Sequence, residues 1–220
     1  MKRTLIVGAS RGIGLALCEV YKAEEHEVIG TSRAPTEALH NIAHEAWTGI
    51  DVTADSLELQ LAEYLKGRAL DRLIISAGIL EADGIANFSP GSLRQQFNVN
   101  AVGALRVAIA LHASMAPEGI IAFITSRMGS ISDNTSGGYY GYRMSKAALN
   151  AGAKSLAQDL VTKRVTVAIL HPGFVQTDMT NGQGFIDVHT SANMLKTQLE
   201  SWKTGNTGVF KHASGENLPW

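Results

Sequence analysis

A tyrosine and a lysine one helical turn apart carry the clearest chemistry in the sequence. The stretch GGYYGYRMSK contains Tyr142 four residues before Lys146. If a helix begins near Gly141, the two side chains lie on the same face of that helix. An ammonium close to a phenol favours the phenolate, which lowers the phenol pKa from its usual value of about 10. The spacing therefore predicts that Tyr142 is a general acid or base, whereas Tyr139 and Tyr140 have no comparable geometry.

Two further polar positions could serve the same reaction. An apolar run ends in FITSRMGS, so Ser126 follows a predicted strand, where its hydroxyl could hydrogen-bond a substrate carbonyl. The stretch FNVNAVG places Asn98 and Asn100 in an otherwise apolar helical segment. Asparagine is unfavourable inside a helix, so we expect either a buried polar role or a position at a kink or in water.

Glycines cluster directly after the first apolar run. VGASRGIG places Gly8, Gly12 and Gly14 just before LALCEVY, a segment of helical period. A glycine-rich turn between a strand and a helix lets backbone amides approach a pyrophosphate, and the helix N-terminus adds a favourable partial charge. The spacing lacks the lysine of a P-loop. The turn therefore predicts a dinucleotide phosphate site, with a tight connection that binds nothing as the alternative.

The residues after the second predicted strand indicate which dinucleotide is bound. In dinucleotide folds, an acidic residue at this place grips the ribose 2′-hydroxyl of NAD. The stretch EVIGTSRAP instead has Ser32 and Arg33. Arg33, helped by Ser10 and Arg11 of the glycine turn, could pair with a 2′-phosphate. NADP(H) is therefore favoured over NAD(H), unless both arginines are ordinary solvated charges.

Composition argues against several other classes of protein. The chain has 220 residues, with 19 basic and 20 acidic side chains and a formal net charge of -1. Because no run of like charge occurs, we expect neither nucleic acid nor a membrane surface as a partner. No stretch approaches the roughly 18 uninterrupted apolar residues of a membrane span, and the apolar part of MKRTLIVGAS is too short for a signal peptide. With its single cysteine, Cys18, the protein is expected to be cytoplasmic.

Short apolar runs alternate with segments of helical period, which is the pattern of successive strand-helix units. The expected strands are Thr4–Val7, Glu27–Thr31, Ala46–Ile50, Arg72–Ser76, Ile120–Thr125, Thr166–Leu170 and Gly208–Phe210. The expected helices are 12–24, 36–44, 54–66, 90–114, 141–161 and 190–203. We therefore expect one α/β domain over residues 1–220, with a doubly wound, mostly parallel seven-stranded sheet and ligands beyond the carboxyl ends of its strands. Residues 180–194, rich in glycine and polar side chains, are expected to form a mobile flap.

Seven motifs occur in an order and spacing that resemble one protein family. They are VGASRGIG, DVT, SAG, NVNAVG, TSRMGS, YRMSK and HPGFVQTDM, and they cover nearly the whole chain. In these motifs the chain is similar to the short-chain dehydrogenase/reductase family, which has a single-domain Rossmann fold. TSRMGSISDNTSGGYYGYRMSKAALN and the final LPW look like the C-factor, or C-signal, branch. The resemblance implies an oxidoreductase that transfers a hydride between a nicotinamide cofactor and a small carbonyl or alcohol substrate.

The resemblance also implies a role for each matching residue. Tyr142 would be the catalytic acid or base, and Lys146 would lower its pKa and contact the nicotinamide ribose. Ser126 would polarise the carbonyl, and Asn100 would support a water that links Lys146 to solvent. Asp51 would meet the adenine. The cofactor-binding residues would be Gly8, Ser10, Arg11, Gly12, Ile13, Gly14, Ser32, Arg33, Asp51, Val52, Ser76, Ala77, Gly78, Tyr142, Lys146, Pro172, Gly173, Val175 and Thr177.

Two departures from the family pattern affect these roles. Ser76 stands where family members usually have an asparagine, so hydrogen bonds at that edge of the sheet are expected to differ. The gap of sixteen residues from Ser126 to Tyr142 is longer than usual by about one helical turn. Ser130 and Ser132 are therefore alternatives for the hydroxyl that holds the substrate.

Other functions are weighed beside this one. A dinucleotide-binding sensor or C-factor-like signalling protein without relevant catalysis is the main alternative, and a sugar-nucleotide epimerase would need a longer chain. His40 and His44 lack the glutamate and third ligand of a zinc site, so no metal is expected. Family members are commonly homodimers or homotetramers through the helices after the fourth and fifth strands, and the resemblance implies the same here.

Overall fold

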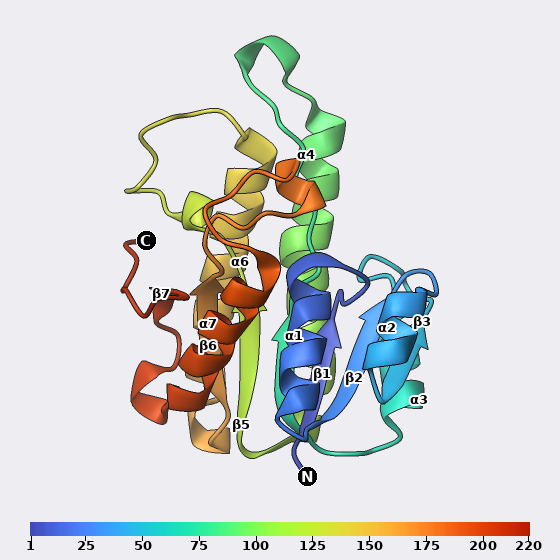
Figure 1. Ribbon diagram of the computed structural model, residues 1–220. Helices are drawn as coiled ribbons and strands as arrows, with labels where there is room; N and C mark the ends of the chain where they lie inside the picture. Colours follow the sequence, from blue (N-terminus) through green and yellow to red (C-terminus); the bar gives the residue numbers. More distant parts are fainter.

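A parallel sheet of seven strands runs through the middle of the molecule (Figure 1). The computed structural model describes residues 1–220. The strands are β1 (Arg3–Val7), β2 (Glu27–Ser32), β3 (Glu45–Thr48), β4 (Leu70–Ile75), β5 (Met115–Ile124), β6 (Thr166–His171) and β7 (Phe210–His212). Their order in space is β3-β2-β1-β4-β5-β6-β7, and every neighbouring pair is parallel. The expected doubly wound sheet is therefore confirmed, and the strand order reverses between β1 and β4.

Helices cover both faces of this sheet. They are α1 (Gly12–Ala23), α2 (Glu37–Ile42), α3 (Leu57–Leu65), α4 (Pro90–Phe97), α5 (Ala104–Leu111), α6 (Tyr140–Asp159) and α7 (Val188–Ser201). One apolar core lies between the sheet and α3, α5 and α6, and a second lies between the sheet and α1, α2 and α7. The strands are solidly apolar because neither face of the sheet meets water. None of the helices combines the length and the hydropathy needed to cross a membrane.

The single helix expected over 90–114 is divided in the structure. A π-helical turn, Asn98–Gly103, separates α4 from α5, and a 3-10 turn follows α5. Asparagine and glycine are poor helix formers, and a π turn is a common way to accommodate a functional side chain within a helix. Asn98 is exposed, whereas Asn100 is fully buried. The buried polar role expected for this segment therefore belongs to Asn100.

Several element boundaries also differ from the sequence prediction. β5 begins at Met115, well before the expected Ile120. The last helix, α7, begins at Val188 because Asp187 caps it by accepting a hydrogen bond of 2.7 Å from the Thr190 amide. The expected flap over 180–194 is therefore too long, since its second half is helical.

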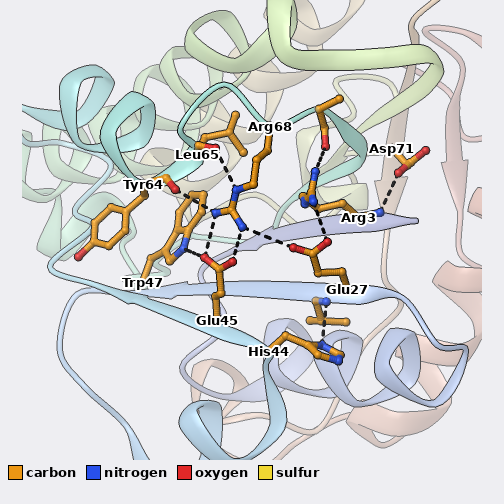
Figure 2. Close-up of polar contacts among 11 residues, drawn as sticks. Arg3, Glu27, His44, Glu45, Trp47, Tyr64, Leu65, Arg68 and Asp71 are labelled. Carbon is orange, nitrogen blue, oxygen red and sulfur yellow. Dashed lines mark hydrogen bonds and ion pairs between the residues drawn. The ribbon is translucent and has the colours of Figure 1, made fainter. Parts of the chain in front are cut away.

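Charged side chains tie the amino ends of four strands together (Figure 2). Arg68, just before β4, donates from both Nη atoms to Glu45 at the start of β3 and from one of them to Glu27 at the start of β2. Arg3 on β1 pairs with Glu27 at 2.8 Å, and its amide donates to Asp71 at 2.7 Å. Each carboxylate of this network therefore has a positively charged or N–H partner within the protein.

Candidate active site

A cleft of about 460 Å³ is lined by the segments that follow β1, β2, β3 and β4. It lies where the sequence places the dinucleotide, beyond the carboxyl ends of the strands and beside the reversal of strand order. Most of the predicted cofactor-binding residues line it, namely Gly8, Ser10, Arg11, Gly12, Ile13, Gly14, Ser32, Arg33, Asp51, Val52, Ser76, Ala77, Gly78 and Thr177.

The glycine turn between β1 and α1 needs its glycines for two reasons. Gly8 has φ +86°, and a Cβ there would lie 2.6 Å from the Ala77 backbone. A Cβ on Gly14 would lie 2.1 Å from the Gly8 carbonyl oxygen, so α1 could not approach β1 as it does. Gly12 has φ +58°, and a Cβ placed on it would have one neighbour within 4 Å, Thr177 Cγ2 at 3.7 Å. The turn therefore gives the cleft a wall of bare backbone at a helix N-terminus, which suits a pyrophosphate.

Two arginines and one aspartate surround the mouth of the cleft. Arg33 is exposed directly after β2 and forms no ion pair within the protein. Arg11 is also exposed, but its Nη1 lies 2.9 Å from Asp178 Oδ2. Asp51 Oδ1 accepts hydrogen bonds from the Thr53 amide and hydroxyl at 2.8 and 2.7 Å, and these bonds lower the pKa of Asp51. Arg33 is therefore the cation whose charge is available at the second strand, where a 2′-phosphate is expected.

Tyr142 lies in the first turn of α6, with its phenol near the side chain of Ser126, which follows β5. Both residues are only 7% exposed. Burial raises the pKa of Tyr142 to about 12, and the neighbouring Ser126 side chain acts in the opposite direction. Ser126 Oγ also accepts a hydrogen bond of 3.1 Å from the Met128 amide, which fixes the position of the hydroxyl. The two oxygens therefore lie together, as a site that binds a carbonyl oxygen requires.

Lys146 shares the face of α6 with Tyr142, as the spacing predicts. Its Nζ lies 5.7 Å from the centroid of the tyrosine ring and donates a hydrogen bond of 3.1 Å to the Ile124 carbonyl. Burial lowers the pKa of Lys146 to about 8. The expected lowering of the Tyr142 pKa by Lys146 is not found, because the amine faces the carbonyl and burial of the phenol dominates.

Asn100 fastens the cleft wall to the helix that carries Tyr142. Its side-chain amide exchanges two hydrogen bonds of 2.8 Å with the backbone of Ile79 and donates a third, of 3.0 Å, to Ser145 Oγ. Ser145 in turn donates to the Tyr142 carbonyl at 2.8 Å. Asn100 therefore fixes the relative position of the cleft and α6, and its expected support of a water beside Lys146 stays a prediction.

Gly78 lies beside the cleft and close to both Asn100 and Lys146. It lines the cleft, and a Cβ on it would lie 3.2 Å from Asn100 Oδ1 and 3.6 Å from Lys146 Nζ. Gly78 therefore borders both the lysine amine and the cleft. This close approach connects two regions that the sequence predicts separately.

The alternative serines have other partners. Ser130 Oγ accepts a hydrogen bond of 3.1 Å from the Asp133 amide, and Ser132 Oγ donates one of 2.7 Å to the Trp220 carbonyl. Neither acts on the pKa of Tyr142, whereas Ser126 does. The geometry therefore favours Ser126.

The loop after β6 contributes less to the cleft than the resemblance implies. Thr177 lines the cleft, but Val175 is buried and bridges to Ile186, and the Pro172 carbonyl accepts a hydrogen bond of 2.8 Å from Ser191. The predicted cofactor-binding residues that lie outside the cleft lining are Tyr142, Lys146, Pro172, Gly173 and Val175.

Some lining residues were missed by the sequence prediction. They are Val7, Thr31, Ile50, Ile79, Val99, Gln176, Asp178, Met179 and Val188. Ile79 directly follows the SAG motif, and Gln176, Asp178 and Met179 stand inside HPGFVQTDM, so the motifs themselves held the signal. Val188 gave no signal, because only the fold brings the start of α7 to the cleft.

Comparisons with known proteins agree with this geometry. A family model described as short chain dehydrogenase matches residues 2–184. The chain is 34% identical to C-signal of Myxococcus xanthus, over 69% of this chain and 93% of that protein. It is 31% identical to 1-hydroxy-2-glutathionyl-2-methyl-3-butene dehydrogenase of Rhodococcus sp. (strain AD45), over 100% of both. A carbonyl reductase from Pseudomonas aeruginosa PAO1, solved in complex with NADP, superposes with a TM-score of 0.85 at 32% identity over 100% of both chains.

Proposed function

The chain belongs to the short-chain dehydrogenase family, and we propose that it is an NADP(H)-dependent enzyme that interconverts a small carbonyl compound and its alcohol. One observation carries the proposal. The buried Tyr142 lies near Ser126 and beside Lys146, and the Lys146 amine lies close to Gly78, which lines the dinucleotide cleft. This is the placement that a proton donor needs next to a site of hydride transfer.

The side chains of this protein handle the oxygen and the proton of the reaction. Ser126 holds the substrate oxygen by a hydrogen bond. Tyr142 donates the proton of its Oη to that oxygen during reduction and takes it back during oxidation. Because the pKa of Tyr142 is about 12, the phenol is protonated at neutral pH and ready to act as the acid. When bound, the nicotinamide supplies or accepts the hydride.

The preference for NADP(H) is supported by charge at the second strand. Ser32 and Arg33 occupy the place of the carboxylate that would repel a 2′-phosphate, and Arg33 has no competing ion pair. The bare backbone of the glycine turn accommodates the pyrophosphate. The similar carbonyl reductase from Pseudomonas aeruginosa was solved with NADP, which is an additional argument for NADP(H) as the cofactor of this protein.

A screen of NADPH consumption tests the proposal. Aldehydes, ketones and quinones are supplied in separate reactions, and Tyr142→Phe is the control for background oxidation. The reverse direction is screened with NADP and alcohols, including one that carries a glutathionyl group, because the relative from Rhodococcus is named for such a substrate. We expect turnover by the wild type on at least one class. Tight NADPH binding without turnover on any class would overturn the catalytic proposal.

A second function is favoured by one comparison. The identity with C-signal extends over 69% of the chain and includes the catalytic segment, so a signalling role without relevant catalysis is a candidate. Retention of Tyr142, Lys146, Ser126 and Asn100 in one arrangement argues for catalysis. A signalling assay with the wild type and Tyr142→Phe separates the two functions, because only a role independent of catalysis survives the substitution.

A cytoplasmic location and a homodimer or homotetramer stay predictions. The helical segment after β4 exposes apolar side chains, among them Val102 at 41% and Ile109 at 52%, in the region where the resemblance implies a subunit contact. Light scattering coupled to size-exclusion chromatography measures the assembly directly.

A further inference from the structure

A buried arginine far from the cleft lacks a partner of opposite charge. Arg72, at the amino end of β4, is only 6% exposed. Its Nε–H is buried without a hydrogen-bond partner in the protein, and no carboxylate forms an ion pair with its guanidinium. The only charge-related contact is with the ring of Tyr21, whose centroid lies 5.4 Å from the guanidinium carbon. A buried charge without a counter-charge is costly, so Arg72 requires an explanation.

None of the neighbouring acidic groups pairs directly with Arg72. Glu24 and Glu200, whose charges act on Tyr21, both pair with Lys196. Asp71 accepts a hydrogen bond from the Arg3 amide. His26 is hydrogen-bonded to Thr4, and burial, helped by the charge of Arg72, lowers its pKa, so the ring carries no positive charge and does not compete with Arg72 for an anion. No carboxylate therefore forms an ion pair with Arg72 within the protein.

Other unpartnered polar groups lie on the same face and at the same end of the sheet. Arg72 aligns with Thr4 on one side and, across Ile120, with Thr166 on the other. Side chains alternate along a strand, and the residues two positions further on pack against α1 and α7, so Arg72 and Thr166 point to these helices. The buried atoms without a partner on this face are Tyr21 Oη, Arg72 Nε, Thr166 Oγ1 and Trp202 Nε1.

We propose that Arg72 and the Tyr21 hydroxyl bind a small monovalent inorganic anion, such as chloride, between α1, α7 and the amino end of the sheet. All four orphaned groups can donate a hydrogen bond, and two of them, Arg72 Nε and Trp202 Nε1, can do nothing else. One monovalent anion neutralises the single charge of Arg72. A single-atom ion needs little room, which suits a site that two helices cover. The site lies at the opposite end of the sheet from the cleft and is independent of the proposed reaction.

Crystals grown with bromide in place of chloride test the site in the wild-type protein. Bromide is identified by its anomalous scattering. We expect an anomalous peak within hydrogen-bonding distance of the Arg72 guanidinium and the Tyr21 hydroxyl. Density that fits water alone at Arg72, without an anomalous peak, overturns the proposal.

Thermal unfolding provides the second test. At constant ionic strength, replacing gluconate by chloride is expected to raise the wild-type Tm by about 5–10 °C when chloride reaches roughly one hundred times its Kd. Arg72→Met should show no such rise, and Tyr21→Phe should weaken the chloride Kd about fivefold through the loss of one hydrogen bond. Arg106→Met, which removes an arginine that pairs with Glu58, is the matched control and should retain the rise. A chloride effect of the same size in Arg72→Met, or none in the wild type, contradicts the proposal.

Discussion

The network around Arg68 and the mouth of the cleft, at opposite ends of the same sheet, use charged side chains in opposite ways. At the amino end, the Arg68 guanidinium is surrounded by Glu45, Glu27 and the carbonyls of Tyr64 and Leu65 (Figure 2). At the carboxyl end, Arg33 lines the cleft, is exposed and forms no ion pair within the protein. Polar groups that satisfy one another stabilise a fold, whereas polar groups left available can bind a ligand.

This contrast predicts different results when each end is altered. Substitutions at the carboxyl end should change turnover or cofactor choice and leave stability nearly unchanged. Substitutions in the amino-end network should lower stability and leave turnover unchanged.

Removal of the phenol hydroxyl should have the largest effect. Tyr142→Phe deletes the proton donor but keeps the ring, so kcat should fall by about 10³-fold. The NADPH Kd should stay within a few-fold, because the hydroxyl does not line the cleft. The Tm should move by no more than about 4 °C, the value expected for one lost hydrogen bond. Steady-state kinetics, NADPH fluorescence and calorimetry measure the three quantities, and unimpaired kcat would refute the assigned role.

Reversal of charge at Arg33 should have the next largest effect. Arg33→Asp replaces the available cation by a carboxylate that repels a 2′-phosphate, so the ratio of kcat/KM with NADPH to kcat/KM with NADH should fall by about 100-fold. Arg127→Asp is a matched control, because Arg127 is also partly exposed but pairs with Asp133 and Glu216 away from the cleft. An unchanged cofactor ratio in Arg33→Asp contradicts NADP(H) preference.

At both ends of the sheet, the sequence predicts some features and not others, and the reason is physical. The sheet, Tyr142 beside Lys146 and the glycine turn follow from local spacing and from motifs that stay close to their strands. The approach of Lys146 Nζ to Gly78 and the hydrogen bonds between Asn100 and the Ile79 backbone depend on segments far apart in sequence.

The amino-end network shows the same limit. Arg68, Glu45 and Glu27 belong to three strand-helix units, and only the parallel register brings them together. The π turn around Asn100 could likewise not be predicted from the helical period of the sequence, because that period does not reveal a single turn of different geometry within a helix. Periodicity predicts elements, whereas contacts between elements decide which polar groups are paired.

Truncation of Arg68 should lower stability without affecting the reaction. Arg68→Ala leaves Glu45 and Glu27 without their shared cation, so the free energy of unfolding should fall by about 1–2 kcal/mol and the Tm by about 3–6 °C. Arg106→Ala breaks a pair with Glu58 that is more exposed and should cost less. Chemical denaturation and kcat/KM measure both expectations. A fall in kcat/KM with unchanged stability would show that the two ends of the sheet are not independent.

The contribution of the amino-end network should depend on pH. Arg68 holds the pKa of Glu45 down to about 2, below the value of about 4.3 for an ordinary glutamate. A carboxyl whose pKa is lowered by folding contributes stability above its unfolded pKa and loses it as the pH falls toward the folded pKa. The Tm difference between the wild type and Arg68→Ala should therefore be largest above about pH 5 and should shrink by about pH 3. A constant difference across this range would mean that Glu45 is not the partner that matters.

The smallest effect is expected for the ion pair between Arg11 and Asp178, which spans the mouth of the cleft. Their side chains are 74% and 72% exposed, so water and salt screen the attraction, and a double-mutant cycle with alanine should give a coupling of about 0.5 kcal/mol or less. Asp178→Ala should release Arg11 and tighten NADPH binding slightly, whereas Arg11→Ala should weaken it. A coupling above about 1.5 kcal/mol that does not depend on salt would show that this pair is shielded from water, as the network around Arg68 is, because only shielded charges couple so strongly.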